Sequence, residues 1–209
     1  MFNPIKTVAV IAIAALTVLI INACGDDDEN SLCKGDETVI VALSLESIWI
    51  YRVTDYDTTD AVIRTFTDTV MITDTTTVEG DPWYETSIEN ELWTNRSDGF
   101  WVWKDHNDDV SEPYLLAKHP ATLGQKYVIP VEDIHPDTMS VADVMAVVSI
   151  PYGSFTATTY QLKSYDGTVL SLAYYVRGIG KVKEIMIPDR ETRLIRRIIE
   201  LQRFSTTGC

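Results

Sequence analysis

The chain has 209 residues, 45% of them hydrophobic, and 31 acidic side chains outnumber 17 basic ones, which gives a formal net charge of −14. This length and apolar content suit one well-buried domain. The negative charge disfavours nucleic acid and bare anionic membrane as partners.

The first residues are predicted to form a signal of the bacterial lipoprotein type. Lys6 precedes an apolar run from Val8 to Ile21, and the small residue Ala23 stands directly before Cys24. A positive start, an apolar centre and a small residue before the processing site are typical of a signal that is removed. An uncleaved spanning helix fits less well, because Val8 to Ala23 would form a helix about 24 Å long against a hydrocarbon core of about 30 Å. Residues 1–23 are therefore predicted to be absent from the mature chain, which keeps 186 residues.

Cys24 is predicted to carry the anchor, a diacylglyceryl group with a further acyl chain on its nitrogen. Each buried methylene contributes about 0.8 kcal/mol, so several chains hold a protein firmly at a membrane. Residues 24–36 follow as an acidic flexible tether, and residues 37–209 as the folded domain. The anchor places the chain in the bacterial cell envelope. Gly25, directly after the cysteine, favours the outer membrane; the periplasmic and surface faces both remain open.

Two further cysteines, Cys33 and Cys209, stand near the ends of the mature chain. In an oxidising compartment they are candidates for a disulfide bond, which would stabilise the fold by about 4 to 5 kcal/mol. The alternatives are that Cys209 stays free or pairs with another chain.

Periodicity of two predicts a mostly antiparallel β domain. Ser47 to Thr54 places Trp49, Tyr51 and Val53 on one face, and Thr65 to Thr73 alternates apolar residues, Phe66 among them, with threonines. Both segments are predicted to be half-buried strands.

Two Asp-Gly pairs predict hairpins, because a two-residue turn needs positive φ. Asp98-Gly99 is expected to join Glu91–Arg96 to Phe100–Lys104, and Asp166-Gly167 to join Thr156–Lys163 to Val169–Val176. Further turns are expected at Gly80-Asp81-Pro82 and at Gly178-Ile179-Gly180, before Lys181–Ile187.

Two segments are ambiguous between helix and strand. Thr138 to Ala146 has a candidate helix cap at Ser140, although its valines also allow a strand. Glu191 to Phe204 carries a helical stripe of apolar residues. Its β surroundings favour a final strand.

Basic residues gather at the end of the chain. From Arg177 onward there are eight Lys or Arg residues and four acidic ones, so this part carries a net charge of +4 and residues 24–176 carry −19. One interpretation is neutralisation between neighbouring strands. The other is a site for an anionic lipid or glycan, with Arg193 and Arg197 as candidate contacts.

Aromatic residues gather between Trp83 and Trp103. Consecutive Phe100 and Trp101 must point to opposite faces of a strand. One face is predicted to be core, and the other presents Trp101 and Trp103 as candidate contacts for a ligand or partner.

No motif predicts catalysis, so no catalytic residue is assigned and an enzyme is not expected. The three histidines, His106, His119 and His135, lack metal-ligand spacing. Asp105 to Asp109 alternates oxygen ligands, but Val110 stands where a calcium loop needs glycine. Neither metal nor cofactor is predicted beyond the covalent lipid on Cys24.

Four segments together resemble a large set of uncharacterised bacterial secreted proteins and lipoproteins. They are Ile48–Tyr51, Leu115–Pro120 with Gly124, Ile150–Phe155 and Tyr174–Lys183. The resemblance implies a strongly curved antiparallel sheet or open barrel, and the ambiguous segments allow at most one or two short helices. Such a sheet is similar to that of the lipoprotein-carrier class, whose concave face holds acyl chains.

The leading functional hypothesis is therefore a non-enzymatic, lipid-anchored envelope protein that binds an apolar ligand or an envelope protein. The alternative is a structural or adhesion module that interacts through its rim loops. An envelope hydrolase acting through a pair of carboxylates is the third hypothesis.

Overall fold

Strands account for nearly all of the regular structure in the described part of the chain. The computed structural model describes residues 37–104, 111–130, 136–187 and 196–206, all within one compact unit, Leu32–Cys209. These ranges contain twelve strands and no helix, so the prediction of a single, mainly β domain is confirmed. In the same ranges no helix reaches the length and hydropathy needed to span a bilayer.

The strands differ widely in length, and the two longest, β2 and β8, each pair with different neighbours along their length. In chain order the strands are β1 (Ile48–Tyr56), β2 (Val62–Val78), β3 (Asp81–Thr86), β4 (Glu91–Arg96), β5 (Gly99–Lys104), β6 (Tyr114–Lys118), β7 (Lys126–Ile129), β8 (Asp137–Ile150), β9 (Gly153–Lys163), β10 (Val169–Val176), β11 (Gly180–Met186) and β12 (Arg196–Ser205).

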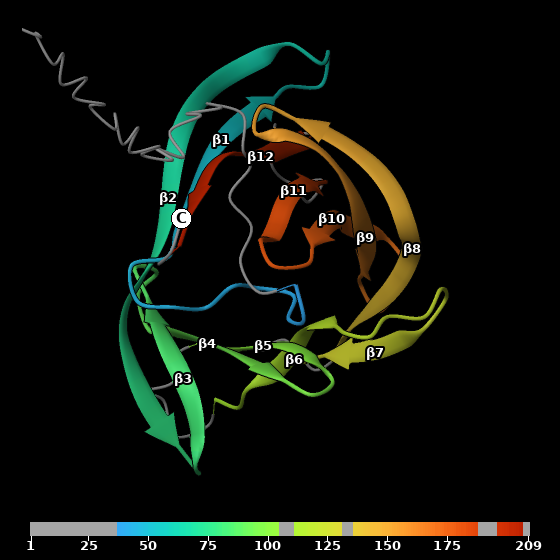
Figure 1. The fold of residues 1–209 in the computed structure, drawn as a ribbon. Helices are drawn as coiled ribbons and strands as arrows, with labels where there is room; N and C mark the ends of the chain where they lie inside the picture. Colours follow the sequence, from blue (N-terminus) through green and yellow to red (C-terminus); the bar gives the residue numbers. More distant parts are fainter. Residues whose placement is uncertain (1–36, 105–110, 131–135, 188–195, 207–209) are drawn as a thin grey trace, which may run out of the picture. The chain divides into compact units, whose positions relative to one another are not determined.

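One antiparallel sheet contains all twelve strands, in the order β6-β5-β4-β3-β2-β1-β12-β11-β10-β9-β8-β7 (Figure 1). The first and last strands, β1 and β12, therefore lie side by side in the middle of the sheet. The two edge strands, β6 and β7, follow each other in the chain. Bulges such as those at Ile50/Tyr51 and Tyr174/Tyr175 increase the local twist. The sheet curls into a nearly closed barrel, as the resemblance implied.

Tyrosine hydroxyl groups close the seam between the two edge strands. Tyr127 of β7 donates a hydrogen bond to the carbonyl of Leu116 at 3.0 Å and accepts one from the Lys118 amide at 3.3 Å. Tyr160 of β9 donates to the Lys118 carbonyl at 2.5 Å. These side chains satisfy backbone groups that would otherwise form an exposed sheet edge.

Both predicted Asp-Gly hairpins are confirmed. The turn between β4 and β5 is Ser97-Asp98, one residue earlier than predicted, because Gly99 already pairs with Arg96 as the first residue of β5; Asp166-Gly167 lies between β9 and β10. Gly99 has a φ of 146°, and a Cβ at this position would collide with the carbonyl oxygen of Ala117 on β6. Only glycine lets the three strands approach so closely.

The two ambiguous segments are strands. The helix considered for Thr138 to Ala146 is wrong: these residues belong to β8, which pairs with β7 and β9 on its two sides. Pairing on both sides, with Met139 and Val141 buried, outweighs the local helix signal. The final strand is confirmed as β12 from Arg196; residues 191–195 lie outside the described part.

The predicted alternation along β1 is confirmed, and the face that carries Trp49, Tyr51 and Val53 is the buried one. The prediction that one face of β2 is buried is confirmed only in part. Val70 and Ile72 are buried, but Phe66 is 39% exposed. The reason is that β3 pairs only with Ile72–Val78 and leaves the first half of β2 uncovered.

Candidate functional site: an interior cavity

A large cavity lies inside the curved sheet. Its volume is about 1160 Å³, and strands from both halves of the sheet line it. Much of its wall is aromatic: Trp49, Tyr51, Trp93, Phe100, Tyr114 and Tyr175. Aliphatic side chains such as Met139 and Leu162 complete it on the side of β8 and β9. Because side chains alternate along each strand, a run of inward positions builds this apolar lining.

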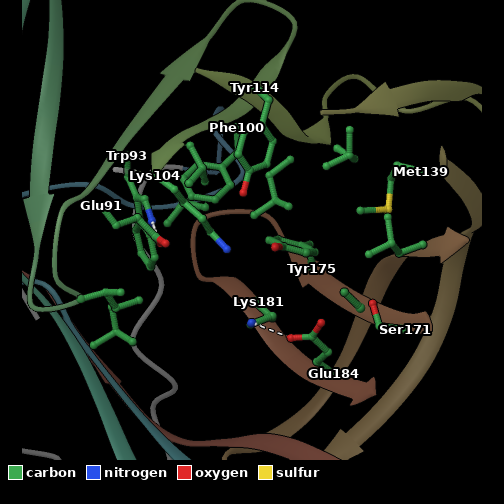
Figure 2. A pocket seen from close by; sticks show the side chains of 18 of the residues that line it. Glu91, Trp93, Phe100, Lys104, Tyr114, Met139, Ser171, Tyr175, Lys181 and Glu184 are labelled. Atoms are coloured by element: carbon green, nitrogen blue, oxygen red, sulfur yellow. Dashed lines mark hydrogen bonds and ion pairs between the residues drawn. The ribbon is translucent and has the colours of Figure 1, made fainter. Parts of the chain in front are cut away.

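Seven charged residues line the same cavity, and four of them, Glu91, Lys104, Lys181 and Glu184, are labelled in Figure 2. Glu91 of β4 and Lys104 of β5 are register partners, while Lys181 and Glu184 both belong to β11. Lys181 Nζ lies 2.7 Å from Glu184 Oε2 and forms an ion pair. These four residues are called the charged band below. It places opposite charges against a mostly apolar lining.

Lys181 and Glu184 keep their opposite charges inside the cavity. Burial by itself would raise the pKa of Glu184, but the neighbouring Lys181 and a hydrogen bond from Ser171 outweigh it and lower that pKa. Burial would lower the pKa of Lys181, but Glu184 outweighs it and raises that pKa. Both groups are therefore ionised at neutral pH, although the side chains are only 31% and 15% exposed.

The other two members of the charged band act on this pair electrostatically. Lys104 contributes to the lowered pKa of Glu184, and Glu91 contributes to the raised pKa of Lys181. Glu91 itself is only 9% exposed, and its Oε1 accepts a hydrogen bond from Trp93 Nε1 at 2.5 Å. The four charges therefore form one electrostatic unit.

Tyrosine hydroxyl groups in the cavity act as neutral hydrogen-bonding groups. Burial raises the pKa of Tyr51, Tyr114 and Tyr175. Tyr51 already donates to the carbonyl of Lys181 at 3.0 Å. Raised pKa values keep all three phenols protonated at neutral pH, so they offer hydrogen bonds rather than a base. Within the described ranges, no three His, Cys, Asp or Glu side chains are grouped to hold a metal ion.

Arg197, a predicted ligand contact, binds a buried carboxylate instead of standing free. Its Nε lies 2.6 Å from Asp55 Oδ1, and its terminal nitrogen donates to Asp55 Oδ2 at 3.1 Å. Arg64 Nε lies 2.6 Å from the second oxygen. Asp55 is fully buried and lies between the two arginines, one from each neighbouring strand. A role for Arg197 toward a ligand stays a prediction.

Charge pairing between strands, one of the two interpretations of the basic C-terminal part, is confirmed. Glu200 of β12 binds Lys183 of β11 at 2.9 Å and Arg52 of β1 at 2.7 Å. Arg196 likewise pairs with Asp60 at 3.1 Å. Arg196 and Arg197 therefore neutralise acids from the N-terminal half, while Glu200 is neutralised by a base on each neighbouring strand.

Trp101 and Trp103 lie on the outer face of β5, opposite the cavity. Trp101 Nε1 donates to Asp98 at 2.8 Å, and the Arg96 guanidinium lies 4.8 Å from its ring centre. Trp103 donates to Ser111 and packs edge-to-face on Trp83, with ring centres 5.9 Å apart. Both indoles are half-buried in an outer aromatic cluster. Phe100, on the opposite face of β5, is core, as predicted.

Several predicted residues lie outside the described part of the chain. They are the lipidation site Cys24, the cysteines Cys33 and Cys209, Arg193, and the candidate calcium segment Asp105–Asp109. The predictions for them stand unchanged.

The sequence analysis did not identify the charged band, although the sequence contains one signal for it. In the segment Phe100–Lys104, the alternation that turns Phe100 and Val102 inward also turns Lys104 inward. The same holds for Glu91 beside Trp93 on β4. A charged residue at an even spacing from a buried aromatic residue, and so on the same face of the strand, is therefore the signal that would have identified these residues.

Comparison with known proteins yields no sequence family. No family model and no curated protein matches the chain. Ten chains of known structure match it. One is a "putative lipoprotein from Parabacteroides distasonis ATCC 8503", to which this chain is structurally similar with a TM-score of 0.42 and 10% identity over 83% of this chain and 99% of that chain.

Proposed function

We propose that this chain is a non-enzymatic lipoprotein of the bacterial envelope that holds an amphipathic small molecule inside its curved sheet. The cavity of about 1160 Å³ carries this proposal. Small-molecule sites are apolar concavities of about 300 to 1,000 Å³ with a few polar groups that orient the ligand. The apolar wall and the charged band match that description, and the volume lies slightly above the range, with room for an acyl chain.

The state of the charged groups supports binding rather than hydrolysis. A hydrolase that uses two carboxylates needs one protonated acid, with a raised pKa, beside an ionised partner. Glu184 has a lowered pKa and is bound by Lys181 and Ser171. Such a carboxylate serves to hold charge and to orient a ligand.

The anchor gives the first test. Replacing Cys24 by alanine removes the acceptor sulfur, so the variant is expected to move almost completely from the membrane fraction to the soluble fraction. Cell fractionation and immunoblotting measure this, with Cys33→Ala as the matched control that stays at the membrane. Continued membrane attachment of the Cys24→Ala variant contradicts the lipid anchor, the predicted envelope location and the membrane as partner.

Native mass spectrometry of the mature Cys24→Ala chain, residues 24–209, tests the cavity, with a lipid-sized mass expected to co-purify. Ala173 lines the cavity and Leu172 beside it on β10 points to the other face. Ala173→Trp fills ligand space and is expected to remove the bound mass. Leu172→Trp adds the same bulk outside and is expected to retain it, with thermal melting confirming that both variants fold. The absence of bound mass from the Leu172→Trp and parent chains, or its retention by Ala173→Trp, contradicts ligand binding in this cavity.

A second candidate, an interaction module, is favoured by the outer aromatic cluster. The Arg96 guanidinium lies 4.8 Å from the ring centre of Trp101 and 5.4 Å from that of Trp83. Exposed or half-exposed indoles with an arginine are common at protein interfaces. If this face carries the function, replacing Trp101 abolishes partner crosslinking on intact envelopes, while Ala173→Trp does not.

A further inference from the structure

Acidic residues outnumber basic ones in the lining of the cavity. The two lysines, Lys104 and Lys181, share this lining with five acidic residues: Asp68, Glu91, Glu112, Asp137 and Glu184. Lys181 and Glu184 neutralise each other through their ion pair. The other charged residues of the lining are then four acids and one lysine, in a chain whose net charge is −14. Such a field attracts a positively charged ligand and repels an anionic one.

Among these five charged residues, Glu91 is the one removed from solvent. Asp68, Lys104 and Glu112 have exposed side chains, and Asp137 is partly exposed. Glu91 is only 9% exposed. Water and salt screen exposed charges, whereas a buried carboxylate acts much more strongly on a group beside it. A ligand inside the cavity therefore responds most to Glu91.

The carboxylate of Glu91 has one oxygen available to a ligand. Its Oε1 accepts the hydrogen bond from Trp93 Nε1 at 2.5 Å. Among the described residues, no hydrogen bond or ion pair engages Oε2. Lys104 stands opposite Glu91 in the β4–β5 register, but within the same part of the chain no ion pair joins the two side chains. Lys181 is already held by Glu184 at 2.7 Å.

Aromatic rings lie beside this carboxylate. The ring of Trp93 packs edge-to-face with those of Trp49 and Phe100, at centre distances of 5.6 Å and 5.4 Å. Tyr114 is close enough for the charge of Glu91 to contribute to its raised pKa. Figure 2 shows Glu91, Trp93, Phe100 and Tyr114 on the same side of the cavity. The faces of aromatic rings attract an ammonium group, so rings and carboxylate favour the same kind of ligand head.

Ligand heads without a positive charge fit this part of the cavity less well. An anionic head meets the like charge of Glu91 and of the three further acids of the lining. An uncharged head covers Glu91 without supplying a counter-charge, and desolvation of a carboxylate in this way costs binding free energy. An ammonium group supplies the missing charge.

We infer that the ligand is a cationic amphiphile, an organic ammonium compound whose head lies against Glu91 and whose apolar chain lies along the aromatic and aliphatic wall. This inference rests on the proposed function, since it assigns the chemistry of the ligand head in the same cavity. A primary ammonium donates a hydrogen bond to Glu91 Oε2, whereas a quaternary one is held by charge and by the ring faces. The positive charge is the requirement that both share.

The test compares three probes that share a ten-carbon chain and differ in the charge of the head: decyltrimethylammonium, 1-decanol and decanoate. Binding to the mature Cys24→Ala chain, residues 24–209, is measured by calorimetry, below the concentrations at which the probes form micelles. Decyltrimethylammonium is expected to bind about tenfold more tightly than each of the other two, through the carboxylate and the ring faces.

Two substitutions in the cavity are expected to change the affinity for the cation in opposite directions. Glu91→Gln keeps the size of the side chain and an acceptor for Trp93 Nε1 but removes the charge. It is expected to weaken decyltrimethylammonium about tenfold and to leave 1-decanol unchanged. Lys104→Met removes the positive charge opposite Glu91 and is expected to strengthen decyltrimethylammonium.

Glu89→Gln is the matched control. It removes the same charge from an exposed side chain on the same segment that does not line the cavity, and it is expected to leave all three affinities unchanged. Loss of affinity for the cation alone cannot arise from a general loss of folding, because 1-decanol reports on the same cavity.

The outcomes separate this inference from the proposed function. If 1-decanol or decanoate binds the parent as tightly as decyltrimethylammonium, or if Glu91→Gln weakens all three probes equally, the cation assignment is overturned and ligand binding stands. If Glu89→Gln weakens the cation as much as Glu91→Gln does, the net charge of the chain and not the cavity carboxylate causes the preference, and the assignment is overturned as well. If none of the three probes binds, the proposed function fails together with the inference.

Discussion

The Arg197→Met variant is expected to lose about 3 kcal/mol of unfolding free energy at pH 7. The physical reason is the burial of its partner, since Asp55 has no exposed surface while Arg197 and Arg64 remain 31% and 59% exposed. Removing Arg197 leaves a buried carboxylate with one partner instead of two. Urea denaturation measures the loss. The control is Arg203→Met on the same strand, whose exposed side chain is expected to contribute less than about 0.5 kcal/mol.

The pH dependence of this loss identifies the carboxylate as its cause. Hydrogen bonding from Arg197 holds the pKa of Asp55 below its ordinary value, with a further contribution from Arg64. A carboxylate with a lowered folded-state pKa adds stability above its unfolded pKa of about 3.9 and loses it as pH falls through the folded value. The difference between the parent and Arg197→Met is therefore expected to be full at pH 7 and to shrink below about pH 4.

A second substitution separates this structural role from a role in ligand binding. Adding Asp55→Asn to Arg197→Met removes the buried charge, so part of the lost stability is expected to return. If Arg197 instead contacts a ligand, its replacement weakens binding while the apo chain keeps its stability. An Arg197→Met chain as stable as the parent would contradict the structural account.

Replacing Trp49 by alanine is expected to cost about 3 to 5 kcal/mol of unfolding free energy. The side chain is 1% exposed, stacks on Phe204 with ring centres 5.4 Å apart, and meets Trp93 edge-on at 5.6 Å. Its Nε1 donates to the buried carbonyl of Ile179 at 2.6 Å. The residue therefore ties β1 to the turn before β11 and to the wall of the cavity.

Two further variants divide this cost into its parts. Trp49→Phe keeps an aromatic ring but leaves the Ile179 carbonyl unpaired, with an expected cost of about 1 to 3 kcal/mol. Trp101→Ala, on the half-buried outer face, is the control of the same residue type and is expected to cost clearly less than Trp49→Ala. Thermal or urea denaturation measures all three. If Trp49→Ala and Trp101→Ala lose equal unfolding free energy, burial on the inner face does not explain the cost of replacing Trp49.

Local patterns predicted the β character of the chain because the signals act over a few residues. The alternation from Ser47 to Thr54 placed Trp49, Tyr51 and Val53 on one face, and that face is buried. Asp98-Gly99 and Asp166-Gly167 identified two hairpins, because the positive φ of Gly99 and Gly167 is a local requirement. Resemblance to the lipoprotein group supplied the curvature, which no local pattern specified.

The candidate site was not predicted, because its residues come from separate strands. Glu91 and Lys104 meet through the β4–β5 register, and Lys181 with Glu184 reaches the same cavity only because the sheet curls. Trp101 and Trp103, the residues that sequence reasoning nominated, lie on the opposite face. The aromatic cluster in the sequence drew attention to Trp101 and Trp103, but it did not show which aromatic side chains face the cavity.

The sequence by itself determined strands β1, β2, β4, β5 and β9 to β12 and the two Asp-Gly hairpins, since alternation and turn residues act locally, whereas the lipid signal before Cys24 stays a prediction. Only the tertiary structure decided that Thr138–Ala146 is a strand, that Phe66 is left exposed, and that four charges share one cavity. Each of these outcomes depends on which strands lie alongside and how far they extend. Those are non-local properties, set by the pairing and curvature of the whole sheet.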